Sequence, residues 1–214
     1  MKLLSVNVSE LKEININGKN HSTGIFKRPV TGKVNVLHDA LEGDHSAEKY
    51  DYGGPTQAAY VYQHENYNYW QDHLNVDYYG PGFFGENFTV ENMPDSRICI
   101  GDIFRFGTAH FQVTKHRPPC KKLGYVAGDI GFIRKFMQAG RFGFYMRVLK
   151  QGEVMAGDEI ELLQADPIGM TVEEYGMMLD VRKGDRLTLE RALEIKDLEE
   201  AHRKRIETLL NKSS

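Results

Sequence analysis

The chain has 214 residues, of which 41% are hydrophobic and 27% charged, and its formal net charge is -3. These values are typical of a globular protein, and they exclude an intrinsically disordered chain and a strongly basic nucleic-acid binder. No apolar run approaches the roughly 18 residues of a membrane span, and residues 1–8 lack the apolar core of a signal peptide. We therefore expect a cytoplasmic protein whose partners include neither a membrane nor a nucleic acid.

The first 165 residues predict a mainly β domain of the α+β class, beginning with a strand over residues 1–8. Runs rich in β-branched and aromatic residues recur between turn signals, as is typical of strands. These predicted strands lie at 34–37, 58–62, 98–106, 109–114, 142–149 and 159–163. Many short strands joined by glycine-rich turns favour a β-barrel or a sandwich.

Two helices are predicted to interrupt the strands. Residues 64–74 place Tyr67, Trp70 and Leu74 on one apolar face. Residues 129–139 show a similar apolar spacing, with Asp129 as a candidate N-cap and Gly140 as the C-terminal stop.

The last 44 residues differ in composition from the rest. They hold 19 charged residues of both signs but only one of the 23 aromatic residues, Tyr175. Thr171 and Glu174 fit a capping box, and helical spacing predicts two further helices over 187–193 and 198–210. We therefore expect a β-domain over residues 1–165 and a helical extension over 166–214, whose mixed charges favour a solvated packing role.

The sequence from Lys115 to Lys122, KHRPPCKK, is the strongest candidate for chemistry. Positive neighbours favour the thiolate of Cys120, which is both a nucleophile and a soft metal ligand. Pro118 and Pro119 stiffen the backbone before Cys120, and Arg117 is able to hold an anion with two hydrogen bonds. The alternative is a basic surface loop that carries an incidental cysteine.

The other cysteine, Cys99, lies in an apolar run and is predicted to be a packing residue. Without a secretory signal or a cysteine framework we expect both thiols to be free, with no disulfide. His110, His116 and Cys120 would form a zinc site only if the fold gathered them, because their spacing matches no recognised zinc pattern.

Two glycine-rich segments are further candidates. Gly53 and Gly54, in Tyr52-Gly53-Gly54-Pro55, allow a close approach of backbone to a ligand. The segment 80–88 adds Glu86 and Asn87, whose polar groups are able to hydrogen-bond a heterocycle. Neither segment matches a nucleotide-binding motif, and simple tight turns are the alternative.

Several short motifs occur in an order that resembles one family. They are Leu41-Glu42-Gly43-Asp44, Tyr52-Gly53-Gly54-Pro55, Gly85-Glu86-Asn87, Gly101-Asp102, Arg117-Pro118-Pro119-Cys120, and the segments 143–148 and 152–158. Over residues 1–165 this order resembles the MOSC domain, the molybdenum cofactor sulfurase C-terminal domain, and within it the YiiM-like bacterial proteins, which carry a small helical extension.

The resemblance implies a distorted β-barrel that binds a molybdenum cofactor, a molybdopterin, through the family cysteine, here Cys120. It implies oxygen removal from a small N-hydroxylated substrate, such as a hydroxylaminopurine or an amidoxime. Electrons would come from a partner redox protein, either a flavoprotein or ferredoxin-like. The molybdenum chemistry belongs to the cofactor, while the protein supplies binding and electrostatics.

The resemblance also suggests which residues bind the cofactor. Its phosphate and dithiolene are anionic, so basic side chains would neutralise it. The stretch 22–27 resembles an N-terminal family motif, which gives Thr23 as a phosphate contact, and Asn87 would meet the pterin edge. The remaining cofactor-binding candidates are Lys27, Arg28, Gly53, Gly54, Glu86, Arg117, Pro119 and Lys121.

Two positions depart from the family pattern. Tyr52 stands where these proteins usually have histidine, and because a phenol titrates near 10 rather than near 6.5, a catalytic proton transfer at this position is in question while hydrogen bonding is not. His116 stands where proline is common, which predicts a looser backbone there. A different function also fits the cysteine: a sulfur carrier or cofactor-binding module in which Cys120 forms a persulfide, without reductase activity.

Overall fold

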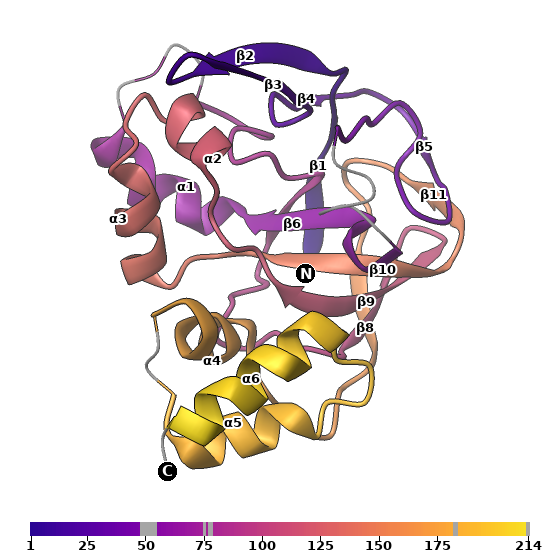
Figure 1. Ribbon diagram of the computed structural model, residues 1–214. Helices are drawn as coiled ribbons and strands as arrows, with labels where there is room; N and C mark the ends of the chain where they lie inside the picture. Colours follow the sequence, from indigo (N-terminus) through magenta and orange to yellow (C-terminus); the bar gives the residue numbers. More distant parts are fainter. Residues whose placement is uncertain (48–54, 75, 77–78, 182–183, 213–214) are drawn as a thin grey trace.

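The structure is a computed structural model that describes residues 1–47, 55–74, 76, 79–181 and 184–212 (Figure 1). The predicted site residues Tyr52, Gly53 and Gly54 lie outside the described residues.

Eight strands form the main sheet, in the order β12-β8-β9-β10-β6-β7-β1-β4. Only the neighbours β6 and β7 run parallel, and every other pair in this sheet is antiparallel. The strands are β1 (Lys2–Val8), β4 (Arg28–Pro29), β6 (Ala59–Gln63), β7 (Phe88–Glu91), β8 (Ile103–Phe106), β9 (Ala109–His116), β10 (Phe144–Lys150) and β12 (Ile160–Gln164).

The α+β class is confirmed, but the closed barrel is not. In the described residues the ladder is open, with β12 at one end and β4 at the other. A single isolated bridge between Lys2 and Glu159 connects the start of β1 with the residue before β12, and one bridge does not make a continuous ladder.

Alternating side chains explain why the central strands form. Along β9 buried residues alternate with half-buried ones. In β8, Phe104 and Phe106 are buried while Arg105 is exposed. The rings of Phe88, Phe106 and Phe111 pack with centroids 5.2 to 5.5 Å apart, so the apolar face of the sheet is the main core.

Each predicted strand overlaps an observed one, yet the run 98–106 is strand only from Ile103 onward. The side chain of Asp102 accepts a hydrogen bond from the backbone N–H of Cys99 at 2.8 Å, which closes a turn instead. Two small sheets complete the β structure: β5 (Val34–Val36) with β11 (Gly152–Val154), and the hairpin β2 (Lys12–Ile16) with β3 (Lys19–Thr23). The hairpin, which turns at Asn17 and Gly18 with positive φ, was not predicted.

Helices cover the sheet on one flank. Helix α1 (His64–Trp70) continues as a 3-10 turn over Gln71–His73, and α3 (Phe132–Ala139) ends at Gly140 with a φ of 65°, as predicted. The predicted start of α3 is wrong, because Asp129 binds the N–H of Gly131 at 2.7 Å and the helix begins later. Trp70, Phe132 and Phe136 are buried together between α1 and α3.

The C-terminal segment packs on the sheet beside β8 and β9 (Figure 1). It contains α4 (Val172–Gly176), a π-helical turn over Met177–Val181, α5 (Arg186–Leu193) and α6 (Glu200–Lys212). Thr171 accepts a hydrogen bond from the N–H of Glu174 at 3.1 Å, so the predicted cap is confirmed. Tyr175 and Ile206 belong to the same buried cluster as the sheet residues.

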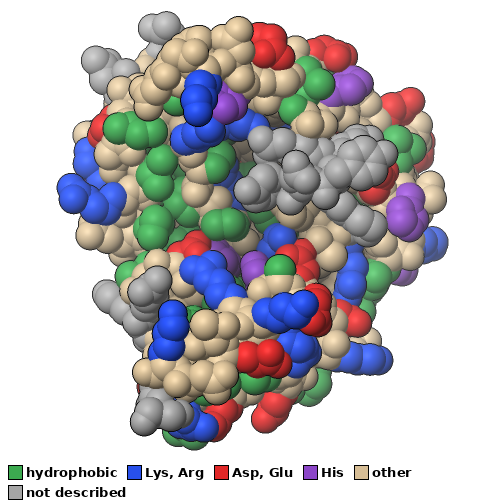
Figure 2. Space-filling model, in the orientation of Figure 1, with side chains coloured by type: hydrophobic (Ala, Val, Ile, Leu, Met, Phe, Trp, Pro, Cys, Tyr) green, Lys and Arg blue, Asp and Glu red, His purple; other side chains and the backbone are tan. Residues whose placement is uncertain are grey.

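Side chains of both charges cover the visible face of the C-terminal helices (Figure 2). Their apolar sides belong to the main core, so the described core runs across residue 165. None of the described helices is long and apolar enough to cross a membrane.

Candidate active site

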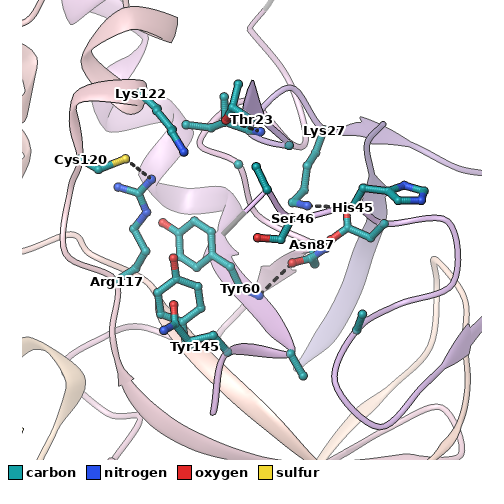
Figure 3. A pocket seen from close by; sticks show the side chains of 18 of the residues that line it. Thr23, Lys27, His45, Ser46, Tyr60, Asn87, Arg117, Cys120, Lys122 and Tyr145 are labelled. Atoms are coloured by element: carbon teal, nitrogen blue, oxygen red, sulfur yellow. Dashed lines mark hydrogen bonds and ion pairs between the residues drawn. The ribbon is translucent and has the colours of Figure 1, made fainter. Parts of the chain in front are cut away.

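A cavity of about 180 Å³ lies beside β6, the end of β9 and the start of β10 (Figure 3). Its walls come from segments far apart in the sequence. They are formed by Thr23, Gly24, Ile25, Lys27, Asp39, Ala40, Asp44, His45, Ser46, Ala47, Gln57, Ala58, Tyr60, Gly85, Asn87, Arg117, Cys120, Lys122 and Tyr145.

Cys120 presents an exposed thiol at the edge of this cavity. It caps α2 (Lys121–Val126), a short helix that was not predicted. Desolvation favours the neutral thiol, but the charge of Arg117 and the backbone N–H groups of Leu123 and Lys122 outweigh it and lower the pKa of Cys120. The predicted thiolate character therefore has a geometric basis.

Arg117 lies below the thiol and is only 5% exposed. Its Nη2 is 3.8 Å from the Cys120 sulfur, and its guanidinium lies 5.5 Å from the ring centroid of Tyr60. Burial opposes the charge of Arg117, yet Cys120, Tyr145 and Tyr60 raise its pKa, so it stays a cation. A positive charge is thus held against the sulfur.

The backbone of Arg117 is fixed by Gly143. The N–H of Arg117 donates to the carbonyl of Gly143 at 3.1 Å, and the N–H of Gly143 donates to Asp95 at 3.0 Å. Gly143 has a φ of 65°, and a Cβ on it would lie 2.4 Å from the carbonyl oxygen of Val61. Only glycine allows this close approach of strands beside the cavity.

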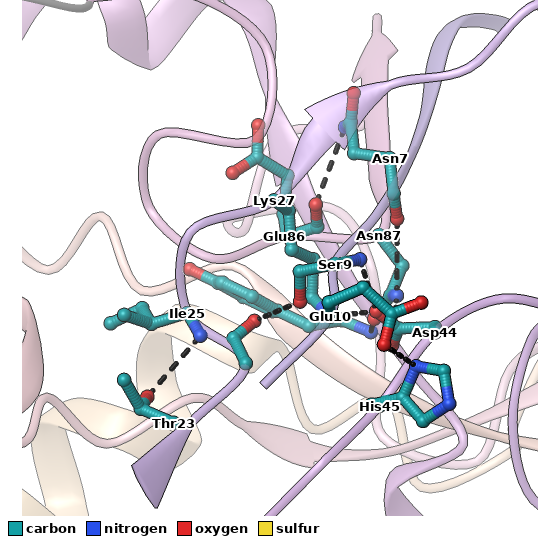
Figure 4. A network of polar contacts seen from close by, with 12 residues as sticks. Asn7, Ser9, Glu10, Thr23, Ile25, Lys27, Asp44, His45, Glu86 and Asn87 are labelled. Atoms are coloured by element: carbon teal, nitrogen blue, oxygen red, sulfur yellow. Dashed lines mark hydrogen bonds and ion pairs between the residues drawn. The ribbon is translucent and has the colours of Figure 1, made fainter. Parts of the chain in front are cut away.

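A polar network forms the opposite wall (Figure 4). The carboxylate of Asp44 accepts hydrogen bonds from Lys27, from the N–H of Ser9 at 3.0 Å and from the amide of Asn87 at 2.8 Å. The Oδ1 of Asn87 accepts the N–H of Tyr60 at 3.0 Å. Burial lowers the pKa of Lys27, and the pairing with Asp44 opposes that shift.

Glu86 does not line the cavity. Its carboxylate, fully buried under the loop, accepts hydrogen bonds from Gly82 N–H and Thr89 Oγ1 at 2.8 Å, from Phe84 N–H at 3.1 Å, and from the Tyr67 hydroxyl. Burial raises the pKa of Glu86, although these donors oppose the shift. Glu86 therefore holds the loop that presents Asn87.

Five of the predicted site residues meet at the cavity: Thr23, Lys27, Asn87, Arg117 and Cys120. Three others point elsewhere or lie beside it. Arg28 donates to the carbonyl of Lys27, Lys121 contacts His21 at 3.1 Å, and Pro119 is a half-buried neighbour of Cys120. Their cofactor contacts stay predictions.

The cavity residues that were not predicted include Asp44, Tyr60, Lys122 and Tyr145. Asp44 closes a motif that carried the family resemblance, and Lys122 belongs to the basic cluster, so both had a signal in the sequence. Tyr60 lies in a strand buried on both faces, where alternation does not tell which side chains face a cavity.

The zinc alternative has no geometric support. In the described part of the chain, no group of three or more His, Cys, Asp or Glu side chains is arranged to hold a metal ion. His116 is 1% exposed and points its Nε2 to Asp180 at 2.9 Å, and its backbone pairs with Phe144 in the β9–β10 ladder. Cys99 is half-buried, and burial raises its pKa to about 11, in keeping with packing.

Comparison with known proteins places the chain in a family. The model of the MOSC domain matches residues 49–161, which include Asn87, Arg117, Cys120 and Gly143. The chain belongs to the MOSC domain family. This MOSC protein is also 36% identical over 202 residues to the uncharacterized protein YflK of Bacillus subtilis, covering 94% of this chain and 90% of that protein.

Two more similarities bear on fold and function. The crystal structure of YiiM from Geobacillus stearothermophilus superimposes with a TM-score of 0.81 and 25% identity, covering 98% of each chain. A protein of Gibberella moniliformis named "Reductase" is 33% identical over 165 residues, which is 76% of this MOSC chain but 29% of that protein.

Proposed function

We propose that this MOSC protein binds a molybdenum cofactor through Cys120 and reduces N-hydroxylated compounds such as hydroxylaminopurines or amidoximes. The observation that carries the proposal is an exposed thiol of lowered pKa, 3.8 Å from a buried arginine, at the edge of a cavity. A thiolate so placed is a ligand for a soft metal. The reductase name of one relative supports the reaction class.

The residues of the cavity fit an anionic pterin cofactor. Lys27 comes from one segment and Arg117 and Lys122 from another; all three have basic side chains, and Thr23 adds a hydroxyl. Both amide hydrogens of Asn87 are engaged, by Asn7 and by Asp44. Its Oδ1 accepts from Tyr60, so one lone pair is left for a donor of the pterin ring.

When bound, the cofactor would supply two-electron removal of oxygen from the N–OH group, with water as product. The chain would supply binding and electrostatics. Arg117 keeps the Cys120 sulfur ionised as a ligand, and the Asp44 network holds Lys27 and Asn87 in place. Electrons would come from a flavoprotein or a ferredoxin-like partner in the cytoplasm, where free thiols persist.

The decisive experiment is elemental. The protein, made in a host that synthesises molybdenum cofactor, would be analysed for Mo, Zn and pterin per chain in wild type, Cys120→Ser and Cys99→Ser. We expect stoichiometric Mo and pterin in the wild type and in Cys99→Ser, and none in Cys120→Ser. A wild type without Mo and pterin from a competent host would sink the proposal.

A second measurement separates the reductase from the sulfur carrier. Mass spectrometry of the intact chain that showed a persulfide on Cys120, with no Mo bound, would favour sulfur transfer. For the loaded protein we expect reduction of benzamidoxime or a hydroxylaminopurine with a flavoprotein or chemical donor. Cys120→Ser should abolish this turnover while Cys99→Ser retains it.

A further inference from the structure

Two acidic side chains of the C-terminal segment reach the end of β9, just before Arg117. Asp180 accepts a hydrogen bond from His116 at 2.9 Å, and Glu199 accepts two from the Lys115 ammonium at 2.8 and 2.7 Å. Lys115 and His116 are 8% and 1% exposed. The helical extension thus makes charged contacts with the strand that leads to Cys120.

Glu199 also makes a second contact. Its carboxylate accepts a hydrogen bond from the hydroxyl of Thr56, in the 3-10 turn Pro55–Gln57. On the other side of this turn, the hydroxyl of Thr114 donates to the carbonyl of Thr56 at 2.7 Å. The next residue, Gln57, lines the cavity, so the contact lies one residue from the cavity wall.

The same carboxylate acts on a second part of that wall. The Lys115 ammonium, held by Glu199, lies 5.9 Å from the ring centroid of Tyr145. Tyr145 lines the cavity, and its ring is 5.4 Å from that of Tyr60. The Glu199 side chain therefore contacts both the Pro55–Gln57 turn and the Lys115 ammonium that lies beside the Tyr145 ring.

We propose that Glu199 is a positioning residue of the cavity, which it builds by joining Thr56 to Lys115. The C-terminal extension is then a working part of the site rather than a packing appendage. Without the Glu199 carboxylate, the nearly buried ammonium of Lys115 would be an unpaired charge, and its side chain would have to move to reach water. The inference rests on the proposed function only in taking this cavity as the functional site, and its test involves no cofactor.

The test reads the turn directly. Backbone amide resonances of Thr56, Gln57 and Ala58 would be compared by NMR in wild type, Glu199→Ala, Glu199→Gln and Glu207→Ala. Glu207 is an exposed residue of α6 and serves as the matched control. We expect shifted or exchange-broadened turn resonances in Glu199→Ala and unchanged ones in Glu207→Ala. Glu199→Gln should give intermediate shifts, because it still accepts the Thr56 hydroxyl but leaves the Lys115 ammonium without its carboxylate.

Two further measurements keep the result decisive. Thr56→Val should perturb the turn less than Glu199→Ala does, because it leaves the Glu199–Lys115 ion pair in place. The double variant should add nothing to Glu199→Ala, which already removes the contact with Thr56. If Glu199→Ala does not fold, the decision rests on Thr56→Val compared at Ala58 with Thr56→Ser, which keeps the hydroxyl that Glu199 accepts. The pH profile of Cys120 alkylation should stay unchanged in these variants, because the β9–β10 ladder and Gly143 hold Arg117.

The proposal would be overturned if Glu199→Ala shifted only resonances of α5 and α6, or if Glu207→Ala shifted the turn resonances equally. Either result would show that Glu199 only fastens the extension.

Discussion

Removing the charge of Arg117 tests the origin of the Cys120 thiolate. At their separation of 3.8 Å, two unit charges attract by about 1 kcal/mol in water and by about 4 kcal/mol at an effective dielectric constant of 20. Because Cys120 is exposed, solvent screens the pair and we take about 1 to 2 kcal/mol. This corresponds to a roughly 5- to 30-fold change in the thiolate fraction below the pKa.

The assay is the rate of alkylation of Cys120 by iodoacetamide from pH 5 to 10, in a Cys99→Ser background so that one thiol reacts. In Arg117→Met the rate should fall by that factor on the acidic side of the profile and meet the parent rate at high pH. Lys121→Met is the matched control, since Lys121 carries the same charge beside Cys120 but points to His21. An unchanged profile in a folded Arg117→Met protein, or an equal loss in Lys121→Met, would refute the reasoning.

Three further predictions concern other positions. Burial raises the pKa of Asp95 to about 7, so the folded chain keeps a proton there that the unfolded chain has lost. The free energy of unfolding should therefore fall by about 2 kcal/mol from pH 5 to 7 in urea titrations, and an equal slope in Asp95→Asn contradicts this. Gly143→Ala should lower the free energy of unfolding by about 2 kcal/mol more than Gly128→Ala does. Both glycines have a positive φ, but only Gly128 has open space where the Cβ would go. Equal urea midpoints for the two variants would exclude the clash at Gly143. Thr171→Ala should lower the free energy of unfolding by about 1 kcal/mol, measured by thermal unfolding, because it removes the α4 cap. Thr171→Ser keeps the capping hydroxyl and should keep the stability.

Local chemistry was predictable where the partners are close in the sequence. Arg117 and Cys120 are three residues apart, so the charge effect on the thiol followed from the order of residues alone. The cap at Thr171 and the stop at Gly140 are likewise properties of one helix end. These features need no knowledge of the rest of the fold.

Contacts between distant segments were not predictable. Asp44 contributes to the cavity because it meets Ser9 and Asn87, and nothing in its own neighbourhood indicates those partners. Glu86 shows the opposite error, because a carboxylate in a glycine-rich loop looks the same in sequence whether it meets a ligand or its own loop. A residue type states which hydrogen bonds are possible, and only the fold decides which are made.

Helix α2 was missed for a related reason. Its six residues make fewer than two turns and include Gly124, so no helical period is visible. Tertiary packing stabilises it, since Leu123 is fully buried and a Cβ on Gly124 would meet Ile130 and Ile133 at 3.0 to 3.3 Å. Helix α2, which follows Cys120, therefore depends on tertiary packing rather than on its own sequence.

The place of the first strand has a consequence for folding. β1 pairs with β4 near residue 28 and with β7 at residues 88–91. Its first residues bond to residues 158–160, with Leu3 N–H donating to Asp158 at 2.9 Å and Ile160 N–H to Met1 at 3.1 Å. During synthesis β1 is made before β7 and well before residues 158–160, so its contacts with these segments form only after they have followed. Because such pairings close long loops, the sheet should form slowly, with β1 as a late partner that is exposed to misassociation while it waits.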